Sequence, residues 1–205
     1  MIMKKSEITK QKILEAAIEE FSLKGLYGAR VNVIAQKSGM NKRLIYEHFG
    51  SKEGLYSAVL TIVYERLAKR EQEVISKKAS YADAIKNIIA MYFNFFYENP
   101  YFIRMVMWEN LNDAAFISKS QASVLKENAL DFARDVLIRG KQEGVFKDTI
   151  DADEVVMSIN MFTFSYYSNI HTLTHILHRD FDSREAMEKR CAHVTSMIME
   201  YILKD

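Results

Sequence analysis

Cysteine, proline and glycine are all scarce in this sequence, which contains one, one and seven of them among 205 residues. A single cysteine cannot form a disulfide bond within the chain, which excludes a disulfide-rich scaffold and is compatible with a reducing compartment. So little glycine and proline excludes an all-β protein built on many tight turns. The composition, 49% hydrophobic and 27% charged, is that of a folded protein with one large domain or two small ones.

Long hydrophobic runs are also missing. The first residues, MIMKKSEITK, have no apolar run after their lysines, so a secretory signal is not expected. The longest charge-free stretch, residues 155–178, contains eleven Ser, Thr, Asn or His residues and would be a poor membrane span. We therefore expect a cytoplasmic protein with no membrane partner.

The net charge is only +1, but positive charge is concentrated at the start of the chain. Residues 1–56 carry ten lysines or arginines and six glutamates, a balance of +4, which leaves −3 for the remaining 149 residues. This asymmetry indicates an anionic partner for the first part of the chain only.

Apolar spacings and capping residues predict an all-α protein with about nine helices. One apolar helix face, which Gly25 would end, is formed at i, i+3, i+4 and i+7 by Leu14, Ala17, Ile18 and Phe21. Further helix starts are expected at Ser51, Ser80, Pro100, Asp151 and Asp182. The domain boundary is expected inside or just after the helix that follows Ser51, because the composition changes there without a linker.

Residues 30–49 have the pattern of two short helices joined by a tight turn. Ala35 is small enough for a helix crossing, Gly39 tolerates the positive φ of a turn, and Ile45 anchors the second helix. Asn41 is placed to cap this second helix, which can then present a basic N-terminus to a DNA major groove. An ordinary helical hairpin with a solvated basic face has the same spacing and is the alternative.

The run from Gly25 to Tyr56, GLYGARVNVIAQKSGMNKRLIYEHFGSKEGLY, resembles the N-terminal DNA-binding domain of the TetR/AcrR family of bacterial transcriptional regulators. The matching elements are Ile34-Ala35, Gly39, Leu44-Ile45-Tyr46, His48-Phe49 and residues 51–55. The resemblance implies a three-helix helix-turn-helix domain over residues 7–67 and a helical effector-binding and dimerisation domain over residues 68–205. The chain departs from the family at Ala29-Arg30, where a Thr or Ser pair is common, so the usual hydroxyl cap is missing.

The resemblance also implies which residues meet DNA. We expect Arg43 to contact a guanine, because its guanidinium fork matches the O6 and N7 atoms of that base. Leu44 is expected at a thymine methyl group, and Lys52 at a phosphate near a helix N-terminus. The full expected set is Arg30, Asn41, Lys42, Arg43, Leu44, Tyr46, His48 and Lys52. For Tyr46 the alternative is a half-buried packing residue, and Glu47 is interpreted as a solvated salt-bridge partner.

The last helix carries apolar residues at intervals of four and three, which is the spacing of a helix–helix seam. These residues are Met187, Cys191, Val194, Ile198 and Tyr201. In the family, two C-terminal helices of each subunit form the dimer interface, so the resemblance implies a homodimer through this seam. A homodimer also suits a palindromic operator in double-stranded DNA, whose half-sites lie about 34–36 Å apart.

Methionine and aromatic residues are concentrated in the middle of the chain and again after residue 155. Such side chains line adaptable apolar pockets, although core packing explains each one singly. The resemblance implies an effector cavity built from central helices, with a small apolar or aromatic effector. The candidate residues are Tyr92, Phe96, Met105, Trp108, Phe162, Tyr166 and Asn169.

Signatures of metal sites and enzymes are weak. His171, His175 and His178 could face one side of a helix and bind Zn or Ni, but a polar helix end at the dimer interface is the preferred interpretation. No HExxH motif, glycine-rich phosphate loop or Glu-x-x-His pair is present, and no cofactor is expected. The expected function is a non-enzymatic, sequence-specific transcriptional regulator, acting as a repressor that its effector releases from the operator. The alternative is a non-enzymatic helical ligand-binding or adaptor protein without specific DNA binding.

Overall fold

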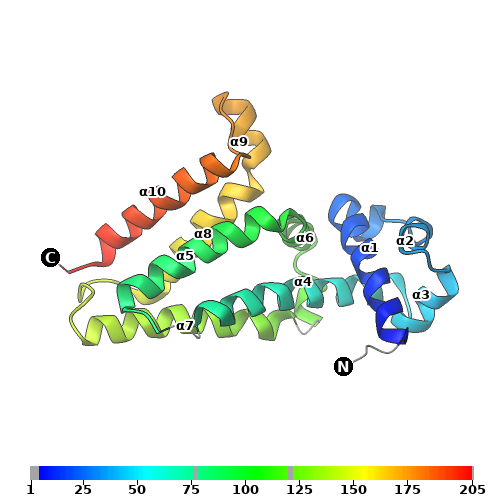
Figure 1. Ribbon diagram of the computed structural model, residues 1–205, viewed down its shortest axis with the longest axis horizontal. Helices are drawn as coiled ribbons and strands as arrows, with labels where there is room; N and C mark the ends of the chain where they lie inside the picture. Colours follow the sequence, from blue (N-terminus) through cyan, green and yellow to red (C-terminus); the bar gives the residue numbers. More distant parts are fainter. Residues whose placement is uncertain (1–4, 76–77, 120–121, 205) are drawn as a thin grey trace. The chain divides into compact units, whose positions relative to one another are not determined.

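The computed structural model describes residues 5–75, 78–119 and 122–204. Within them the chain forms ten α-helices and one short 3-10 helix, which confirms the expected all-α class (Figure 1). The helices are α1 (Lys5–Gly28), α2 (Val31–Ser38), α3 (Lys42–Phe49), α4 (Lys52–Ile75), α5 (Tyr81–Glu98), α6 (Pro100–Leu111), η1 (Ile117–Lys119), α7 (Ala122–Gln142), α8 (Ala152–Ser168), α9 (Ile170–Leu177) and α10 (Arg184–Ile202). No helix in the described segments is long and apolar enough to cross a membrane.

The helix count is one higher than expected because the charge-free segment 155–178 is divided in two. Asn169 leaves the helical conformation, with φ −109° and ψ 6°, and its side-chain amide donates to the backbone oxygen of Ser165. A side chain that bonds to its own preceding turn competes with the backbone ladder, which is typical of a helix boundary. The long helix expected there is therefore α8 followed by α9.

Capping residues define several of the helix starts. Ser80 Oγ accepts the Asp83 N–H, and Asp151 accepts from the first turn of α8, as their spacing predicted. The start predicted at Asp182 is wrong by one position. The cap of α10 is Ser183, whose Oγ accepts the Ala186 N–H at 3.3 Å.

The described residues pack into two compact units. Unit 1 comprises residues 1–65 and 101–124, and unit 2 comprises residues 66–100 and 125–205. The chain crosses between the units inside α4, close to the boundary expected at residue 67. Unlike the sequence-based expectation, α6 packs with the first unit, although it follows α5 in the chain.

The core of unit 1 is built on α1, which α2 joins in close packing. All four residues of the predicted apolar face are buried, and the Phe21 ring meets the Tyr56 ring edge-on at 5.1 Å. Gly25 interrupts α1 with φ +63° and ψ −180°, a conformation open essentially to glycine alone. The chain thus bends before it enters α2.

The core of unit 2 is formed by α5 packing against α8 and α10. Aromatic rings fill the space between α5 and α8. Tyr92 and Phe96 stack at 5.8 Å, and Phe93 meets the Tyr166 ring at 5.9 Å. The Tyr167 hydroxyl also donates to the backbone oxygen of Phe93 at 2.7 Å. Protein thus surrounds the buried face of α8, whereas Met157 and Met161 of the same charge-free segment, and most of α9, are exposed.

Candidate functional site

A helix-turn-helix is formed by α2 and α3. Gly39 ends α2 in the left-handed conformation, with φ +67°, and its N–H together with that of Met40 closes the turn on α2 carbonyls. The Asn41 side chain accepts the Leu44 N–H at 2.9 Å, which confirms its capping role. Ile34 and Ile45 are fully buried and anchor α2 and α3 in the core of unit 1.

The opposite face of α3 is open and basic at its start. The Arg43 side chain is 87% exposed and pairs with Glu47 at 2.8 Å, and the Lys42 ammonium lies 5.8 Å from the centre of the Tyr46 ring. Tyr46 is exposed on this face, and Leu44 is half-buried. An exposed i,i+4 ion pair contributes little to stability, so Arg43 can exchange Glu47 for another partner at low cost.

Two cationic residues, Arg30 and Lys52, lie at the starts of the helices on either side of α3 in the chain. Arg30 is the N-cap residue of α2, and its exposed side chain provides no cap. The absence of a Thr or Ser at this position predicted that the hydroxyl cap would be missing. Its backbone N–H donates instead to Glu20 Oε1 at 3.2 Å. Lys52 begins α4 and its ammonium donates to the Tyr27 backbone oxygen at 3.4 Å. His48 is half-buried on α3.

Tyr27 was missed by the sequence-based reasoning. Its side chain is 78% exposed, although tyrosine has a large apolar ring. It sits at the end of α1, where its carbonyl holds Lys52 and where Arg30 follows three residues later. No periodicity in the sequence indicated that this aromatic side chain would be exposed.

Two residues expected at the effector cavity belong to unit 1 instead. Met105 is fully buried in that unit, and the Trp108 indole N–H donates to the Ser22 backbone oxygen at 3.2 Å. The assignment of these two α6 residues to an effector site is therefore corrected. The Trp108 side chain fastens α6 to α1, which the periodicity of α6 alone could not reveal.

A buried carboxylate lies one position further along α6. Glu109 is 2% exposed, and its Oε2 atom accepts the backbone N–H groups of Phe116 and Ile117 at 3.1 and 2.8 Å. Burial is the main cause that raises the pKa values of Tyr56 and Tyr64 well above the ordinary range of tyrosine, and the charge of Glu109 is the second cause. The carboxylate thus holds the segment after α6 and stands beside two tyrosines that stay neutral.

The remaining effector candidates have different surroundings within the described part of unit 2. Tyr92, Phe96 and Tyr166 are buried in the aromatic core of unit 2, and burial raises the pKa of Tyr92, whose hydroxyl donates to Glu71 at 2.8 Å. Phe162 is half-buried on α8 and Asn169 is exposed. Packing between helices accounts for Tyr92 and Phe96, whereas Tyr166 also lines a cavity at the end of α8.

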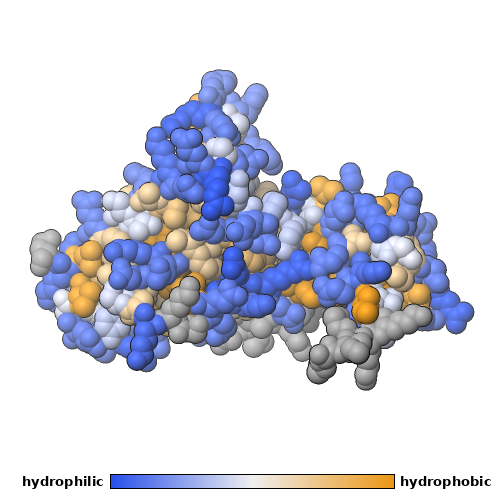
Figure 2. All heavy atoms as spheres, in the orientation of Figure 1, coloured by the Kyte–Doolittle hydropathy of each residue, from blue (hydrophilic) through white to orange (hydrophobic). Residues whose placement is uncertain are grey.

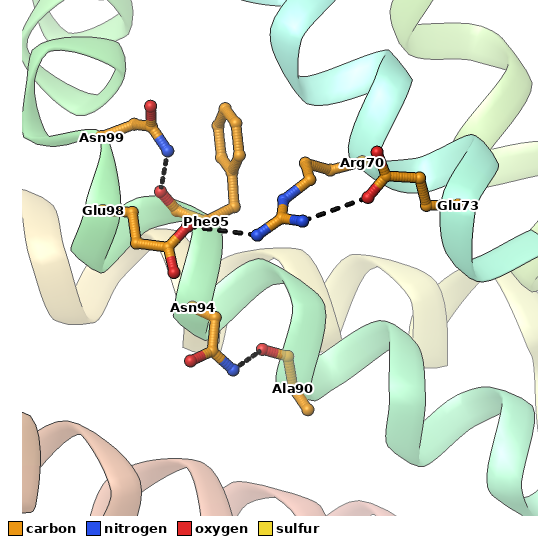
Figure 3. A network of polar contacts seen from close by, with 7 residues as sticks. All are labelled: Arg70, Glu73, Ala90, Asn94, Phe95, Glu98 and Asn99. Carbon is orange, nitrogen blue, oxygen red and sulfur yellow. Dashed lines mark hydrogen bonds and ion pairs between the residues drawn. The ribbon is translucent and has the colours of Figure 1, made fainter.

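A polar groove of about 390 Å³ opens between α4 and α5. Its guanidinium, Arg70, is held between Glu73 at 3.1 Å and Glu98 at 3.2 Å (Figure 3). The Asn94 amide points back to the Ala90 carbonyl of its own helix at 2.7 Å. The cation of this groove is already neutralised by protein groups.

The seam predicted for dimerisation lies mainly inside one protomer. Met187, Val194 and Ile198 are buried where α10 packs on α5, so they have no surface left for a partner, and this part of the prediction is corrected. Cys191 is half-buried, and burial raises the pKa of its thiol, which disfavours the reactive thiolate. Tyr201 is the one fully exposed member of the set.

The predicted histidine cluster is not assembled as a metal site. His171 and His175 lie on α9, but His178 is its C-cap residue, with φ +51°. Among the described residues, no group of three or more His, Cys, Asp or Glu side chains is placed to hold a metal ion. The break in the helix at His178 removes the regular spacing on which that hypothesis depended.

Two family models match this chain. Residues 13–59 match the model described as "Bacterial regulatory proteins, tetR family", which includes α2 and α3. Residues 82–198 match the model described as "Tetracyclin repressor-like, C-terminal domain". Together they cover the helix-turn-helix and most of unit 2.

Individual relatives agree with these matches. The chain is 30% identical, over 87% of its length and 84% of the relative's, to the HTH-type transcriptional repressor NicS of Pseudomonas putida. Its fold is similar to that of a TetR transcriptional regulator from Chloroflexus aurantiacus, with TM-score 0.79 and 19% identity over 99% and 100% of the two chains. It is also similar to FadR from Bacillus subtilis in complex with stearoyl-CoA, with TM-score 0.73 and 17% identity over 93% and 98%.

Proposed function

The chain belongs to the TetR family of bacterial regulatory proteins, and on that premise we propose how it recognises DNA and what releases it. It is a DNA-binding transcriptional repressor that responds to a small-molecule ligand. The observation that supports the following proposal most strongly is the capped, exposed and basic start of α3.

We propose that α3 enters the major groove with Arg43 directed at a guanine. The side chain extends into solvent from the first turn, and its one ion pair with the described residues is to Glu47, so its guanidinium can turn two N–H donors to a guanine. Leu44 lies next to it, beside the position of a thymine methyl group. This pair accounts for base recognition.

Phosphate contacts are assigned to the residues around this helix. Lys42 and Tyr46 form one group on α3, with Asn41 at its capped start. Arg30 and Lys52 form a second group at the starts of α2 and α4, where helix dipoles also favour anions. His48 completes the expected set from its half-buried position on α3. These contacts set the register of the helix on the duplex.

We propose a homodimer that binds a palindromic operator. Large apolar side chains remain exposed on the two C-terminal helices, namely Met157 and Met161 on α8 and Met197 and Tyr201 on α10. Each pair is spaced by four residues and therefore shares one helix face. A partner that covers this dimer face would bury the apolar surface and place two α3 helices on two half-sites.

The proposed effector is small, with an aromatic or otherwise apolar body; the stearoyl-CoA bound to FadR, which has a similar fold, supports an apolar part through its acyl chain alone. Its binding to unit 2 would favour a dimer geometry that no longer fits the half-site spacing. The protein needs no enzymatic activity and no cofactor for this role, and it would act in the cytoplasm, where the DNA is. The adaptor alternative predicts no sequence preference for DNA.

Selection of genomic fragments by the full-length protein tests this proposal. The wild type and an Arg43→Ala, Tyr46→Ala variant are incubated with fragments of the source genome at near-physiological salt. Enrichment of a palindromic site by the wild type, and its loss in the variant, support sequence-specific DNA binding through α3. Absence of enrichment after the protein has been unfolded, stripped of bound ligands and refolded contradicts it.

A further inference from the structure

A second cavity, of about 510 Å³, lies in unit 2 where the end of α8, the segment after α9 and the first turns of α10 meet. This volume is within the range of small-molecule sites. Figure 2 shows mostly hydrophilic residues over this end of unit 2. None of the roles assigned so far uses this cavity.

One wall of the cavity is aromatic and tightly held. Tyr166 from α8 is buried, and its ring meets the Phe181 ring edge-on at 6.2 Å. The Tyr166 hydroxyl also donates to the Phe181 backbone oxygen at 2.6 Å, which fixes the segment after α9 to α8. This wall offers ring surface to a planar ligand, and its shape is held by a hydrogen bond within the protein.

The opposite wall is basic. Ala186, Lys189, Arg190 and His193 follow each other at i, i+3, i+4 and i+7, so one face of α10 lines the cavity. Arg179 adds a guanidinium from the segment after α9, 5.8 Å from the centre of the Phe181 ring.

These cations form no close ion pair with the described residues of the protein. In the part of the chain that the structure describes, Arg179, Lys189 and Arg190 form no ion pair. Asp180 and Glu185 also line the cavity, and Asp180 accepts the Asp182 N–H, so three cationic side chains share the cavity with two carboxylates.

The groove between α4 and α5 differs from this cavity in how its arginine is paired. There Arg70 is held by two glutamates, whereas the half-buried Arg190 lines the cavity with Tyr166 and forms no ion pair with the described residues. A partly desolvated guanidinium without a partner attracts an anion of matching geometry, and a carboxylate can accept two of its N–H groups.

We propose that this cavity binds a small aromatic carboxylate, whose ring lies against Tyr166 and Phe181 and whose carboxylate is held by Arg190 with Lys189 and Arg179. The inference deepens the proposed function, on which it rests, because it names the chemical class and the site of the effector. The basic face of α10 continues into the proposed dimer face, since His193, Met197 and Tyr201 follow at intervals of four. A ligand here is thus placed to change how two protomers meet.

Calorimetric titration of the full-length protein, without DNA, tests the site. Benzoate and 2-naphthoate are the probes, and benzamide, 2-naphthamide and inorganic phosphate are the comparison ligands. We expect the carboxylates to bind, the amides to bind at least about tenfold more weakly, and phosphate to compete poorly because it lacks a ring.

Variants on α10 separate the cavity from general charge effects. Arg190→Gln is expected to weaken carboxylate binding at least about tenfold, and Lys189→Gln to weaken it less. Arg184→Gln is the matched control, because Arg184 is on the same helix but pairs with Glu188 and does not line the cavity. Its affinity for the probes should equal that of the wild type, and equal losses in Arg184→Gln and Arg190→Gln would overturn the inference.

Release of the selected operator is measured separately with the same probes. The inference is supported if a carboxylate binds the wild type and releases it from the operator, and if Arg190→Gln abolishes this binding. Operator binding by a protein that binds neither carboxylate, or that binds amides or phosphate equally well, overturns the inference and leaves the proposed function intact. Carboxylate binding without operator release overturns the effector assignment. A protein that selects no operator at all contradicts the proposed function, while the titration alone still decides the site.

Discussion

The indole ring of Trp108 lies directly against Gly25. A Cβ atom added to Gly25 would come within 2.7 Å of the Trp108 ring, and the same glycine has φ +63°. The bend in α1 and the packing of α6 against it therefore depend on Gly25, which has no side chain. The hydrogen bond from the indole N–H to Ser22 fixes the ring in this place.

Replacing Gly25 by alanine should lower the free energy of unfolding by about 3 kcal/mol, because the backbone conformation and the ring contact both disfavour a Cβ atom. Chemical denaturation of the full-length protein measures this loss. Gly28→Ala is the control, since the nearest atom to its Cβ is 3.5 Å away, in ordinary contact. A similar loss in both variants would show that Trp108 is not the cause.

Removing the cap of α3 should separate DNA binding from general stability. Asn41→Ala loses the bond to the Leu44 N–H and should cost about 1 kcal/mol of unfolding free energy. Ser80→Ala removes the corresponding cap of α5 in unit 2 at a similar cost. Operator affinity, measured by fluorescence polarisation, should fall in Asn41→Ala alone. An equal fall in Ser80→Ala would contradict the assignment of α3 as the recognition helix.

Stability should decrease in alkaline solution because of buried tyrosines. Burial and the Glu109 charge raise the pKa of Tyr64 in the folded protein above its ordinary value of 10.0. The folded state therefore keeps this proton at a pH where the unfolded chain loses it. The contribution is fully present below about pH 10 and falls by about 1.4 kcal/mol per pH unit above it.

Denaturant unfolding measures this effect as the slope of the unfolding free energy against pH. The measurement covers the range from about pH 9 to about pH 11, in which a free tyrosine ionises. Tyr64→Phe should make the slope shallower, because one proton-retaining group is removed. Tyr27→Phe is the control, since its side chain is 78% exposed and should leave the slope unchanged. A slope that Tyr64→Phe leaves unaltered would refute this explanation.

The proposed dimer face can be tested with charge. Met157→Glu combined with Met161→Glu places two carboxylates on exposed apolar positions of α8, where burial by a partner would be costly. The variant should sediment as a monomer at concentrations at which the wild type is a dimer. Ile138→Glu, on α7, is the control because this exposed residue lies outside the proposed face. A dimeric double variant would place the interface elsewhere.

Local features of the fold could be predicted from the sequence because they depend on neighbouring residues. The Asn41 cap, the Gly39 turn and the buried face of α1 involve residues within one or two helical turns. The seam on α10 was also correctly identified as apolar, but periodicity cannot tell which partner covers it. Val194 is covered by its own protomer.

Features that depend on long-range packing could not be predicted in this way. Trp108 is 83 residues from Gly25 in the chain. The methionine and aromatic residues near Trp108 in the sequence suggested a ligand pocket, whereas its ring packs on α1. The spacing of Lys189, Arg190 and His193 was visible in the sequence. Its meaning depends on the aromatic wall formed by Tyr166 and Phe181, which lie on other segments. Burial and pairing of a charge are properties of the folded chain.

The most direct test of the central claim is the equilibrium affinity of the full-length protein for its selected operator and for a shuffled sequence of equal composition, over a range of salt concentrations. The account predicts a preference for the operator of at least about 10³-fold at near-physiological salt, with affinity falling steeply as salt rises. Arg43→Gln should reduce that preference about tenfold or more, while Arg184→Gln should not. Equal affinity for the two sequences, or a preference that Arg43→Gln leaves unchanged, would contradict it.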